Sequence, residues 1–88
     1  MFYMYIIQST KDDFIYLGST KDLKQRFVEH NSRKVESSKS HLPYRLLYYE
    51  AYLSEKDARI RESMLKLRGQ ARVQLMNRLK HSFEQGKT

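Results

Sequence analysis

The chain contains no cysteine, so a disulfide framework and a thiolate metal site are both excluded. It also has no apolar run that approaches the roughly 20 residues of a membrane-spanning helix. The first nine residues, MFYMYIIQS, include no basic residue, and their apolar stretch is too short for a signal peptide. These absences predict an intracellular, cytoplasmic protein that does not associate with membranes.

The length also sets a limit. The chain has 88 residues, which suffice for one domain but leave no room for a second, cofactor-binding domain. Apolar residues make up 40% of the chain and charged residues 31%, a balance typical of a globular protein rather than a disordered one. We expect a single domain over residues 1–83 and a flexible tail over residues 84–88.

Acidic residues are comparatively few, with 10 Asp and Glu against 17 Lys and Arg, for a net charge of +7. The excess is concentrated in residues 59–80, where seven basic residues accompany one acid, Glu62, for a net charge of +6. Such a basic segment favours a polyanionic partner, most commonly nucleic acid. The alternative is a solvated helical face that only keeps a small protein soluble.

Two amino-terminal segments, residues 2–8 and 14–19, are rich in β-branched and aromatic residues and predict two strands. The polar residues between them predict a turn, so the strands form a hairpin. Ser19 followed by Asp22 fits a capping box and predicts a helix over about residues 21–30 that ends near Asn31.

Residues 31–43 show no periodicity and predict a mobile surface loop, closed by Pro43. Residues 44–52 predict the third strand, followed by a helix over about 55–67 that Ser54 caps. After an interruption at Gly69, the last helix is expected over residues 70–83. Its apolar stripe consists of Leu75, Leu79 and Phe83. The order β-β-α-β-α-α predicts an α/β (α+β) fold, in which helices flank a small, mostly antiparallel three-stranded sheet.

Four polar or aromatic residues in this arrangement are candidates for a site. Tyr5 and Tyr16 lie at equal distances from the midpoint of residues 10 and 11. A turn centred there would make them cross-strand neighbours, although paired phenols are more often plain sheet packing. Arg26 and His30 are spaced i, i+4 and share one helix face. A snorkelling arginine and a structural histidine are the alternatives there.

Glu62 is the fifth candidate, on the helix predicted over residues 55–67. It could form an ordinary i, i+4 ion pair with Lys66 and contact Arg59 three residues earlier. It could also be a metal ligand, because one carboxylate on a basic surface can hold a hydrated divalent ion against a phosphate.

Taken together, the spacing of these residues resembles the GIY-YIG nuclease family. The matching residues are Tyr3-Met4-Tyr5, Tyr16-Leu17-Gly18-Ser19-Thr20, Asp22-Leu23, Arg26, His30-Asn31, Tyr48-Tyr49-Glu50-Ala51, Ser54-Glu55-Lys56-Asp57-Ala58, Arg61 and Glu62. The resemblance covers about residues 2–68 and is strongest to short stand-alone members, which are similar to the amino-terminal domain of the excinuclease C subunit. Tyr3 replaces the first glycine of the motif.

The resemblance implies a GIY-YIG-like fold and a DNA endonuclease that uses one divalent ion, Mg²⁺ or Mn²⁺, in DNA repair, recombination or processing. By position, Tyr5 and Tyr16 match the two motif tyrosines. One of them, more often the one at the position of Tyr16, activates or positions the attacking water. Arg26 matches the arginine that neutralises charge on the scissile phosphate.

Three further positions carry implied roles. His30 matches a histidine that orients or deprotonates a tyrosine. Glu62 matches the sole protein ligand of the metal. Gly18 matches the glycine of the second motif, where a side chain would crowd the site.

DNA is the expected partner, and a recruiting protein or a homodimer could supply targeting. Basic side chains expected to contact DNA are Arg33, Lys34, Lys39, Arg61, Lys66, Arg68 and Arg72. In a bacterium the protein would be cytoplasmic and associated with the nucleoid. The main alternative is a non-catalytic module with a GIY-YIG fold that binds nucleic acid or a partner protein without cutting. A small basic RNA-binding protein with accidental motif matches is a third interpretation.

Overall fold

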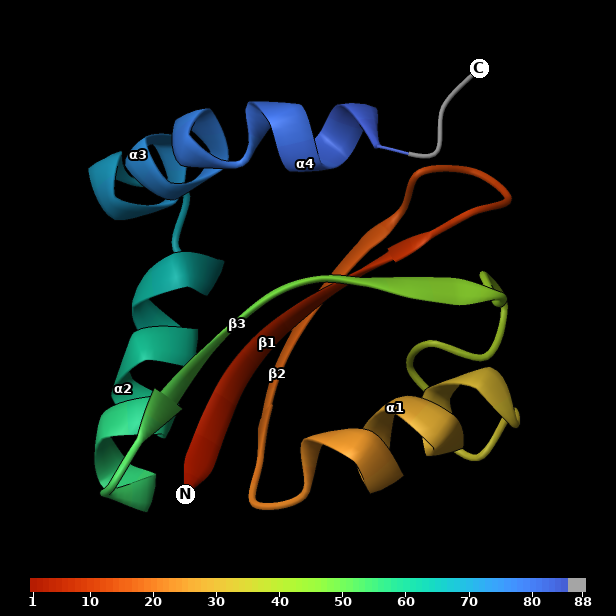
Figure 1. Cartoon of the computed structure of the whole chain (residues 1–88), viewed down its shortest axis with the longest axis horizontal. Helices are drawn as coiled ribbons and strands as arrows, with labels where there is room; N and C mark the ends of the chain where they lie inside the picture. The colour runs from red at the N-terminus through yellow and green to blue at the C-terminus, as the bar shows by residue number, and fades with distance from the viewer. Residues whose placement is uncertain (86–88) are drawn as a thin grey trace.

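The computed structural model describes residues 1–85 of the chain. Its elements are β1 (Phe2–Ser9), β2 (Ile15–Thr20), α1 (Leu23–Asn31), β3 (Tyr44–Tyr52), α2 (Glu55–Lys66), α3 (Gln70–Arg78) and α4 (Lys80–Glu84) (Figure 1). This is the predicted order, except that the last helix is divided at Leu79. Leu79 is itself buried in the core, and Phe83 beyond the division packs against the same core.

The three strands form one sheet in the order β2-β1-β3, with antiparallel pairing on both sides of β1. This confirms the predicted α+β fold with a small antiparallel sheet. The register of β1 against β3 shifts between Ile6 and Ile7, so that Leu47 has no partner opposite it. Such a bulge increases the local twist of the two strands.

Helices cover both faces of the sheet. Alternate residues of β1 point to opposite faces, so that each face contributes side chains to a different cluster. Met4 and Ile6 are fully buried with Leu65 of α2 in a core that also includes residues of α3. Tyr5 and Ile7 belong to a second cluster, which packs against α1. Figure 1 shows α1 on the opposite side of the sheet from α3 and α4.

The start of α1 differs from the prediction. Its N-cap is Asp22, whose side chain accepts a hydrogen bond from the backbone N–H of Gln25 at 3.0 Å. Ser19 lies inside β2 and has no capping role. Asn31 ends the helix as predicted, and its side chain exchanges two hydrogen bonds with the backbone of Tyr44. The end of α1 is thereby joined to the start of β3.

Residues 32–43 contain neither helix nor strand, which confirms the predicted loop. The loop is not wholly on the surface, however, because Val35 and Ser38 are buried. Its end is attached to the hairpin turn, since the carbonyl oxygen of Pro43 accepts a hydrogen bond from the N–H of Thr10 at 2.9 Å.

Smaller differences concern the carboxyl half. Ser54 occupies the N-cap position of α2, but its side chain forms no capping hydrogen bond. Of the predicted tail, Glu84 belongs to α4, whereas residues 86–88 lie outside the described residues. Every helix within residues 1–85 is too short or too polar to cross a membrane.

Candidate active site

Tyr5 and Tyr16 lie on the same face of the hairpin, but not directly opposite each other. Tyr5 pairs with Gly18, and Tyr16 pairs with Ile7. The turn is therefore centred between residues 11 and 12, one residue later than predicted. The two tyrosines are diagonal neighbours instead, and long aromatic side chains bridge that separation. Their rings stack with centroids 6.4 Å apart.

Gly18 lets the Tyr5 ring lie across β2. A Cβ atom at Gly18 would lie 2.5 Å from the hydroxyl oxygen of Tyr5. The Tyr5 side chain is buried and bonded to His30, so it has no free direction in which to move. The close approach of ring to backbone accordingly requires glycine at this position.

His30 is fully buried between Tyr5 and the loop that follows α1. Its Nε2 lies 2.7 Å from the Tyr5 hydroxyl, and its Nδ1 lies 2.7 Å from Oγ of Ser38. The Ser38 hydroxyl donates to the carbonyl oxygen of Val35, so it accepts from Nδ1–H of the histidine. Nε2 is then unprotonated and accepts the hydrogen of the Tyr5 hydroxyl.

The pKa values of this pair agree with that arrangement. Burial, together with the nearby charge of Arg26, lowers the pKa of His30 to about 4. The imidazole is therefore neutral at pH 7. Burial raises the pKa of Tyr5 to about 12, and the Arg26 guanidinium only partly opposes the rise. Tyr5 consequently stays protonated and acts as a hydrogen-bond donor.

Arg26 lies one helical turn before His30, with its side chain 37% exposed. Its Nη1 donates to Glu29 at 3.0 Å, and its guanidinium also interacts with the Tyr5 hydroxyl. Tyr16 is half-buried, with its ring centroid 4.7 Å from that of His30 and its hydroxyl 3.4 Å from Oγ of Ser37. The guanidinium is thus a partly exposed positive charge at the rim of the tyrosine–histidine cluster.

Glu62 approaches from α2, with its side chain 19% exposed. Its negative charge contributes to the raised pKa of Tyr5, so the carboxylate lies within electrostatic range of that hydroxyl. Its Oε2 is 2.5 Å from Nζ of Lys66, which is the ion pair that the helix spacing predicts. The second predicted contact is wrong, because Arg59 pairs with Glu55 instead.

A second charged cluster attaches α2 to β3 next to Glu62. Nε and Nη2 of Arg61 both donate to the carboxylate of Glu50, at 2.9 and 3.1 Å. The hydroxyls of Tyr48 and Tyr52 donate to the same carboxylate. Paired guanidinium–carboxylate bonds of this kind are strong and directional. They hold the turn of α2 that carries Glu62 against the sheet.

The residues present fit a hydrated divalent ion rather than a protein cage. Within residues 1–85, no group of three or more His, Cys, Asp or Glu is placed to hold a metal. One carboxylate suffices for Mg²⁺ when water and a substrate phosphate supply the other ligands. Binding of the ion would require Lys66 to release the Glu62 carboxylate. The Lys66 side chain is flexible and 54% exposed, so it is able to move aside.

The predicted DNA-contacting residues fall into two groups. The exposed side chains of Arg33, Lys34 and Lys39 lie in the loop after α1, and Lys39 pairs with Glu36 at 3.0 Å. Arg68 is exposed and lies two residues beyond Lys66, the last residue of α2, which pairs with Glu62. Arg61 and Arg72 instead make internal contacts. Nη1 of Arg72 donates to the carbonyl oxygen of Leu65 at 3.3 Å.

Ser38 is a site residue that sequence reasoning did not identify. It contacts His30 from eight residues further along the chain, across a segment with no periodicity. Glu50 was also given no role, although it lies within the matched motif. No local sequence signal identifies either residue, because each contact depends on how separate elements pack.

Sequence comparison relates the chain to known proteins. The family described as GIY-YIG catalytic domain matches residues 1–77. UPF0213 proteins of Streptococcus pyogenes serotype M5 (strain Manfredo) and serotype M28 (strain MGAS6180) are each 39% identical over 67 residues, which cover 75% of this chain and 72% of theirs. No solved structure matches significantly. The chain belongs to the GIY-YIG family, a nuclease superfamily, and has UPF0213 proteins among its relatives.

Proposed function

We propose that the protein is a divalent-metal-dependent endonuclease that hydrolyses phosphodiester bonds in DNA. The observation that carries the proposal is the convergence of Tyr5, Tyr16 and His30 in one cluster, with Arg26 at its rim and Glu62 within electrostatic range. These are the residues that the motif spacing singled out, and they come from four separate elements, β1, β2, α1 and α2. The reaction adds water across a P–O bond and leaves one phosphate end and one hydroxyl end.

Arg26 is suited to the scissile phosphate. Its guanidinium is always charged, partly exposed and anchored on one side by Glu29. A planar fork of N–H donors binds a phosphate through two parallel hydrogen bonds. We assign Arg26 to hold the phosphate and to offset the charge that develops during attack.

The two tyrosines have different roles in this proposal. Tyr5 is buried and donates its proton to His30, so it is unsuited to accept a proton from water. Tyr16 is half-buried, and its hydroxyl accepts a long hydrogen bond of 3.4 Å from Oγ of Ser37. We therefore assign the Tyr16 hydroxyl to orient the attacking water, and Tyr5 and His30 to hold the Tyr16 ring in place.

Glu62 would hold the divalent ion, Mg²⁺ or Mn²⁺, together with water and the phosphate. The ion, when bound, supplies polarisation of a phosphoryl oxygen. The Arg61–Glu50 contact supports this role because it keeps the preceding residue of α2 against β3.

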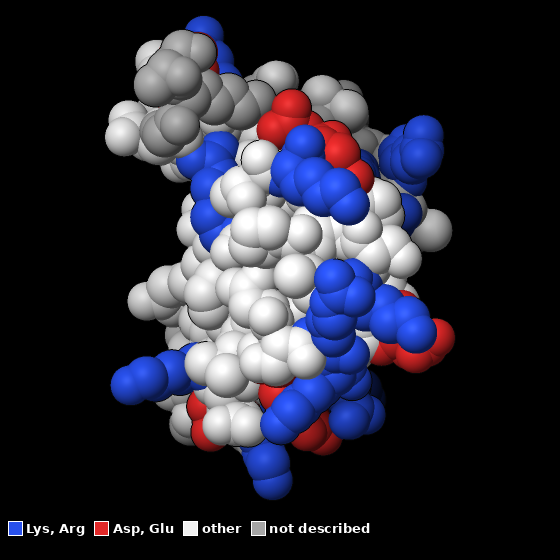
Figure 2. Space-filling model, turned by 90° about the vertical axis from the view of Figure 1, so that its right-hand side faces the viewer, with Lys and Arg blue, Asp and Glu red and all other residues white. Residues whose placement is uncertain are grey.

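The basic loop residues Arg33, Lys34 and Lys39 are suited to contact neighbouring phosphates. Figure 2 shows Lys and Arg side chains bordering a largely uncharged face of the molecule. Phosphate contacts of this kind are independent of sequence and weaken as salt rises. Recognition of a particular target would then come from DNA structure, a recruiting protein or a second copy of the chain.

The test is cleavage of supercoiled plasmid and branched DNA with Mg²⁺ or Mn²⁺. Glu62→Ala and addition of EDTA should each abolish cutting, while DNA affinity stays within about twofold of the wild type. Glu55→Ala is the matched control, because Glu55 lies on the same helix and pairs only with Arg59 among the described residues. Cleavage by Glu62→Ala would overturn the metal assignment.

One observation favours a second function, a non-catalytic nucleic-acid-binding module. Lys66 neutralises the Glu62 carboxylate at 2.5 Å, as in an ordinary surface ion pair. On this alternative, DNA binds with the usual salt dependence but is not cut under either metal. Lys66→Ala separates the two functions, because it releases the Glu62 carboxylate. In a true nuclease this should raise the rate of DNA cleavage at limiting metal concentration. In a binding module it should change only the affinity for DNA.

A further inference from the structure

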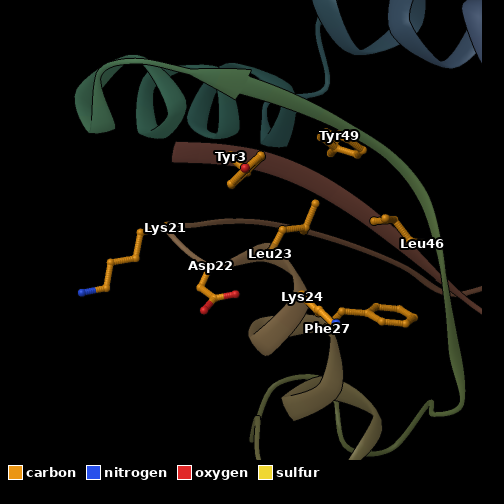
Figure 3. Close-up of a pocket in the computed structure, with 8 residues that line it drawn as sticks. All are labelled: Tyr3, Lys21, Asp22, Leu23, Lys24, Phe27, Leu46 and Tyr49. Carbon is orange, nitrogen blue, oxygen red and sulfur yellow. The ribbon is translucent and has the colours of Figure 1, made fainter. Parts of the chain in front are cut away.

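An open groove lies between α1 and the outer part of the sheet. We call it the aromatic groove and define it by Tyr3, Tyr49, Leu46, Leu23, Phe27 and Lys24 (Figure 3). Its volume is about 500 Å³, within the roughly 300–1,000 Å³ of ordinary ligand pockets. Figure 3 shows the two tyrosines and Leu46 on the strands and Leu23 and Phe27 on the helix side.

The aromatic groove adjoins the candidate active site. Tyr49 of β3 is the register partner of Tyr5, so the two side chains are neighbours on one face of the sheet. Tyr3 lies two residues before Tyr5 on the same face, at about 7 Å along the strand. Phe27 directly follows Arg26 in α1. The groove and the candidate active site therefore share the α1 face of the sheet, with the Tyr5 ring over β2 and the groove toward β3.

The lining is aromatic and open to solvent. Tyr49 is 51% exposed and Leu46 is 40% exposed. The rings of Tyr3 and Tyr49 meet edge to face with centroids 5.9 Å apart.

Positive charge lies at one end of the aromatic groove. Lys21 and Lys24 are exposed and line it. Within residues 1–85, neither pairs with a carboxylate. The adjacent Asp22 carboxylate accepts from the N–H of Gln25 and caps α1. Exposed rings beside unpaired cations are suited to a flat π-system that carries a neighbouring anion, as a nucleotide does.

We propose that the aromatic groove binds an unpaired nucleobase of the DNA substrate, on the same face of the sheet as the Arg26 phosphate site. The inference rests on the proposed endonuclease function and names the substrate class of the same site. In a duplex both faces of a base are covered by its stacking neighbours. A base must therefore be single-stranded or displaced before its face can contact a protein ring. The substrate is accordingly DNA with an unpaired nucleotide, as at a gap, flap or bulge.

The test measures binding without cleavage. Two fluorescent duplexes of identical length are used in EDTA, one fully paired and one with a single-nucleotide bulge, and both carry 2-aminopurine at the same position. Dissociation constants are measured by anisotropy, and stacking is measured by the 2-aminopurine emission. The variants are Tyr49→Ala and Tyr49→Phe. Met64→Ala is the control, because Met64 is similarly exposed, at 49%, on α2.

The wild type should bind the bulged duplex at least fivefold more tightly than the paired one, with a change in the 2-aminopurine emission. Tyr49→Ala should remove most of that preference and of the emission change, while its affinity for the paired duplex stays the same. Tyr49→Phe keeps the ring and should retain both, and Met64→Ala should behave as the wild type.

Two results would overturn the inference. Equal affinity of the wild type for both duplexes would do so, as would a preference that Tyr49→Ala leaves intact. In either case Glu62-dependent plasmid cleavage would still stand, so failure of the aromatic groove is distinguishable from failure of the nuclease. If neither duplex binds, both proposals fail, and an apolar peptide becomes the better occupant to examine.

Discussion

The two faces of the sheet are built from alternate residues of the same strands, yet they differ in chemistry. Met4 and Ile6 of β1 face α2 and α3 and lie in a core whose buried members are all apolar. Tyr5, between them in sequence, faces α1 and forms a hydrogen bond to a buried histidine. One strand thus supplies the main hydrophobic core on one side and the candidate active site on the other.

The difference shows how a small domain can separate stability from activity. The apolar face is covered by three helices and is closely packed. The α1 face is covered by one helix of nine residues, which leaves the aromatic groove and the Arg26 rim open. Substitutions in the apolar core and on the α1 face should therefore have separable effects, on folding for the core and on cleavage for the α1 face. Glu62 is the one proposed site residue that comes from α2, on the side of the apolar core.

The largest effect on stability is expected in the apolar core. Leu65→Ala should lower the free energy of unfolding by about 3 kcal/mol, because Leu65 is fully buried and truncation leaves a cavity. Leu67→Ala, at the C-cap of the same helix but 64% exposed, should change it by less than about 0.5 kcal/mol. Urea unfolding measures both. The folded fraction of Leu65→Ala should keep its cleavage rate, and loss of that rate would break the separation of the faces.

Gly18→Ala should have the next largest effect. The added Cβ would lie 2.5 Å from the hydroxyl oxygen of Tyr5, which is too close for two unbonded atoms. The free energy of unfolding should therefore fall by between about 2 and 3 kcal/mol. Cleavage should fall further, since Tyr5 and His30 must shift. Gly69→Ala is the control, because nothing lies within 4 Å of its added Cβ. Equal thermal shifts for the two variants would contradict the crowding argument.

The pH dependence of stability tests the buried histidine. Burial lowers the pKa of His30 to about 4 from 6.5, so the unfolded chain takes up the proton first as the pH falls. The stabilisation is complete above pH 6.5 and is lost as the pH falls through 6.5 towards 4. Between pH 7 and pH 5 the loss should be about 2 kcal/mol.

Urea unfolding at several pH values measures this loss, and the imidazole resonances in NMR spectra report the pKa directly. His81→Gln is the control, because it removes an imidazole that is 82% exposed rather than buried. A His30 resonance that titrates near pH 6.5 would contradict the assigned neutral, buried state.

The smallest effect is expected for Ser38→Ala. It leaves Nδ1–H of His30 without its acceptor and should cost about 1 kcal/mol, since the Tyr44 hydroxyl still holds the backbone of residue 38 at 2.8 Å. The loss of cleavage rate, expressed as a free energy, should exceed this loss of stability, because the tautomer of His30 is no longer set. Ser40→Ala, at an exposed position of the same loop, is the control. Unchanged imidazole ¹⁵N shifts in Ser38→Ala would refute this role.

Most of the fold was predictable, because strand and helix patterns are local. The β-branched and aromatic residues of FYMYIIQ and the aromatic run in YRLLYYEAY indicated β1 and β3 correctly. The errors came where two local signals compete. Ser19 and Asp22 both suit an N-cap, and only pairing of Ser19 with Met4 in the sheet decides between them. The division at Leu79 likewise depends on its burial against the core.

The candidate site was predictable as a set of residues but not as a network. Motif spacing identified Tyr5, Tyr16, Arg26, His30 and Glu62, and their assigned roles stay predictions until cleavage is measured. The spacing did not reveal which tyrosine bonds to His30. It also placed the two tyrosines directly opposite each other, because a hairpin register depends on where the turn closes.

The sequence by itself determined the class of fold, the family and the residues that carry the motif, because these follow from local periodicity and from spacing along the chain. Only the tertiary structure decided that Tyr5 is a donor, that Ser38 sets the histidine tautomer and that an aromatic groove adjoins Arg26. Each of these depends on contacts between segments far apart in the chain. Burial and register, which no local pattern encodes, set both the hydrogen bonds and the pKa values there.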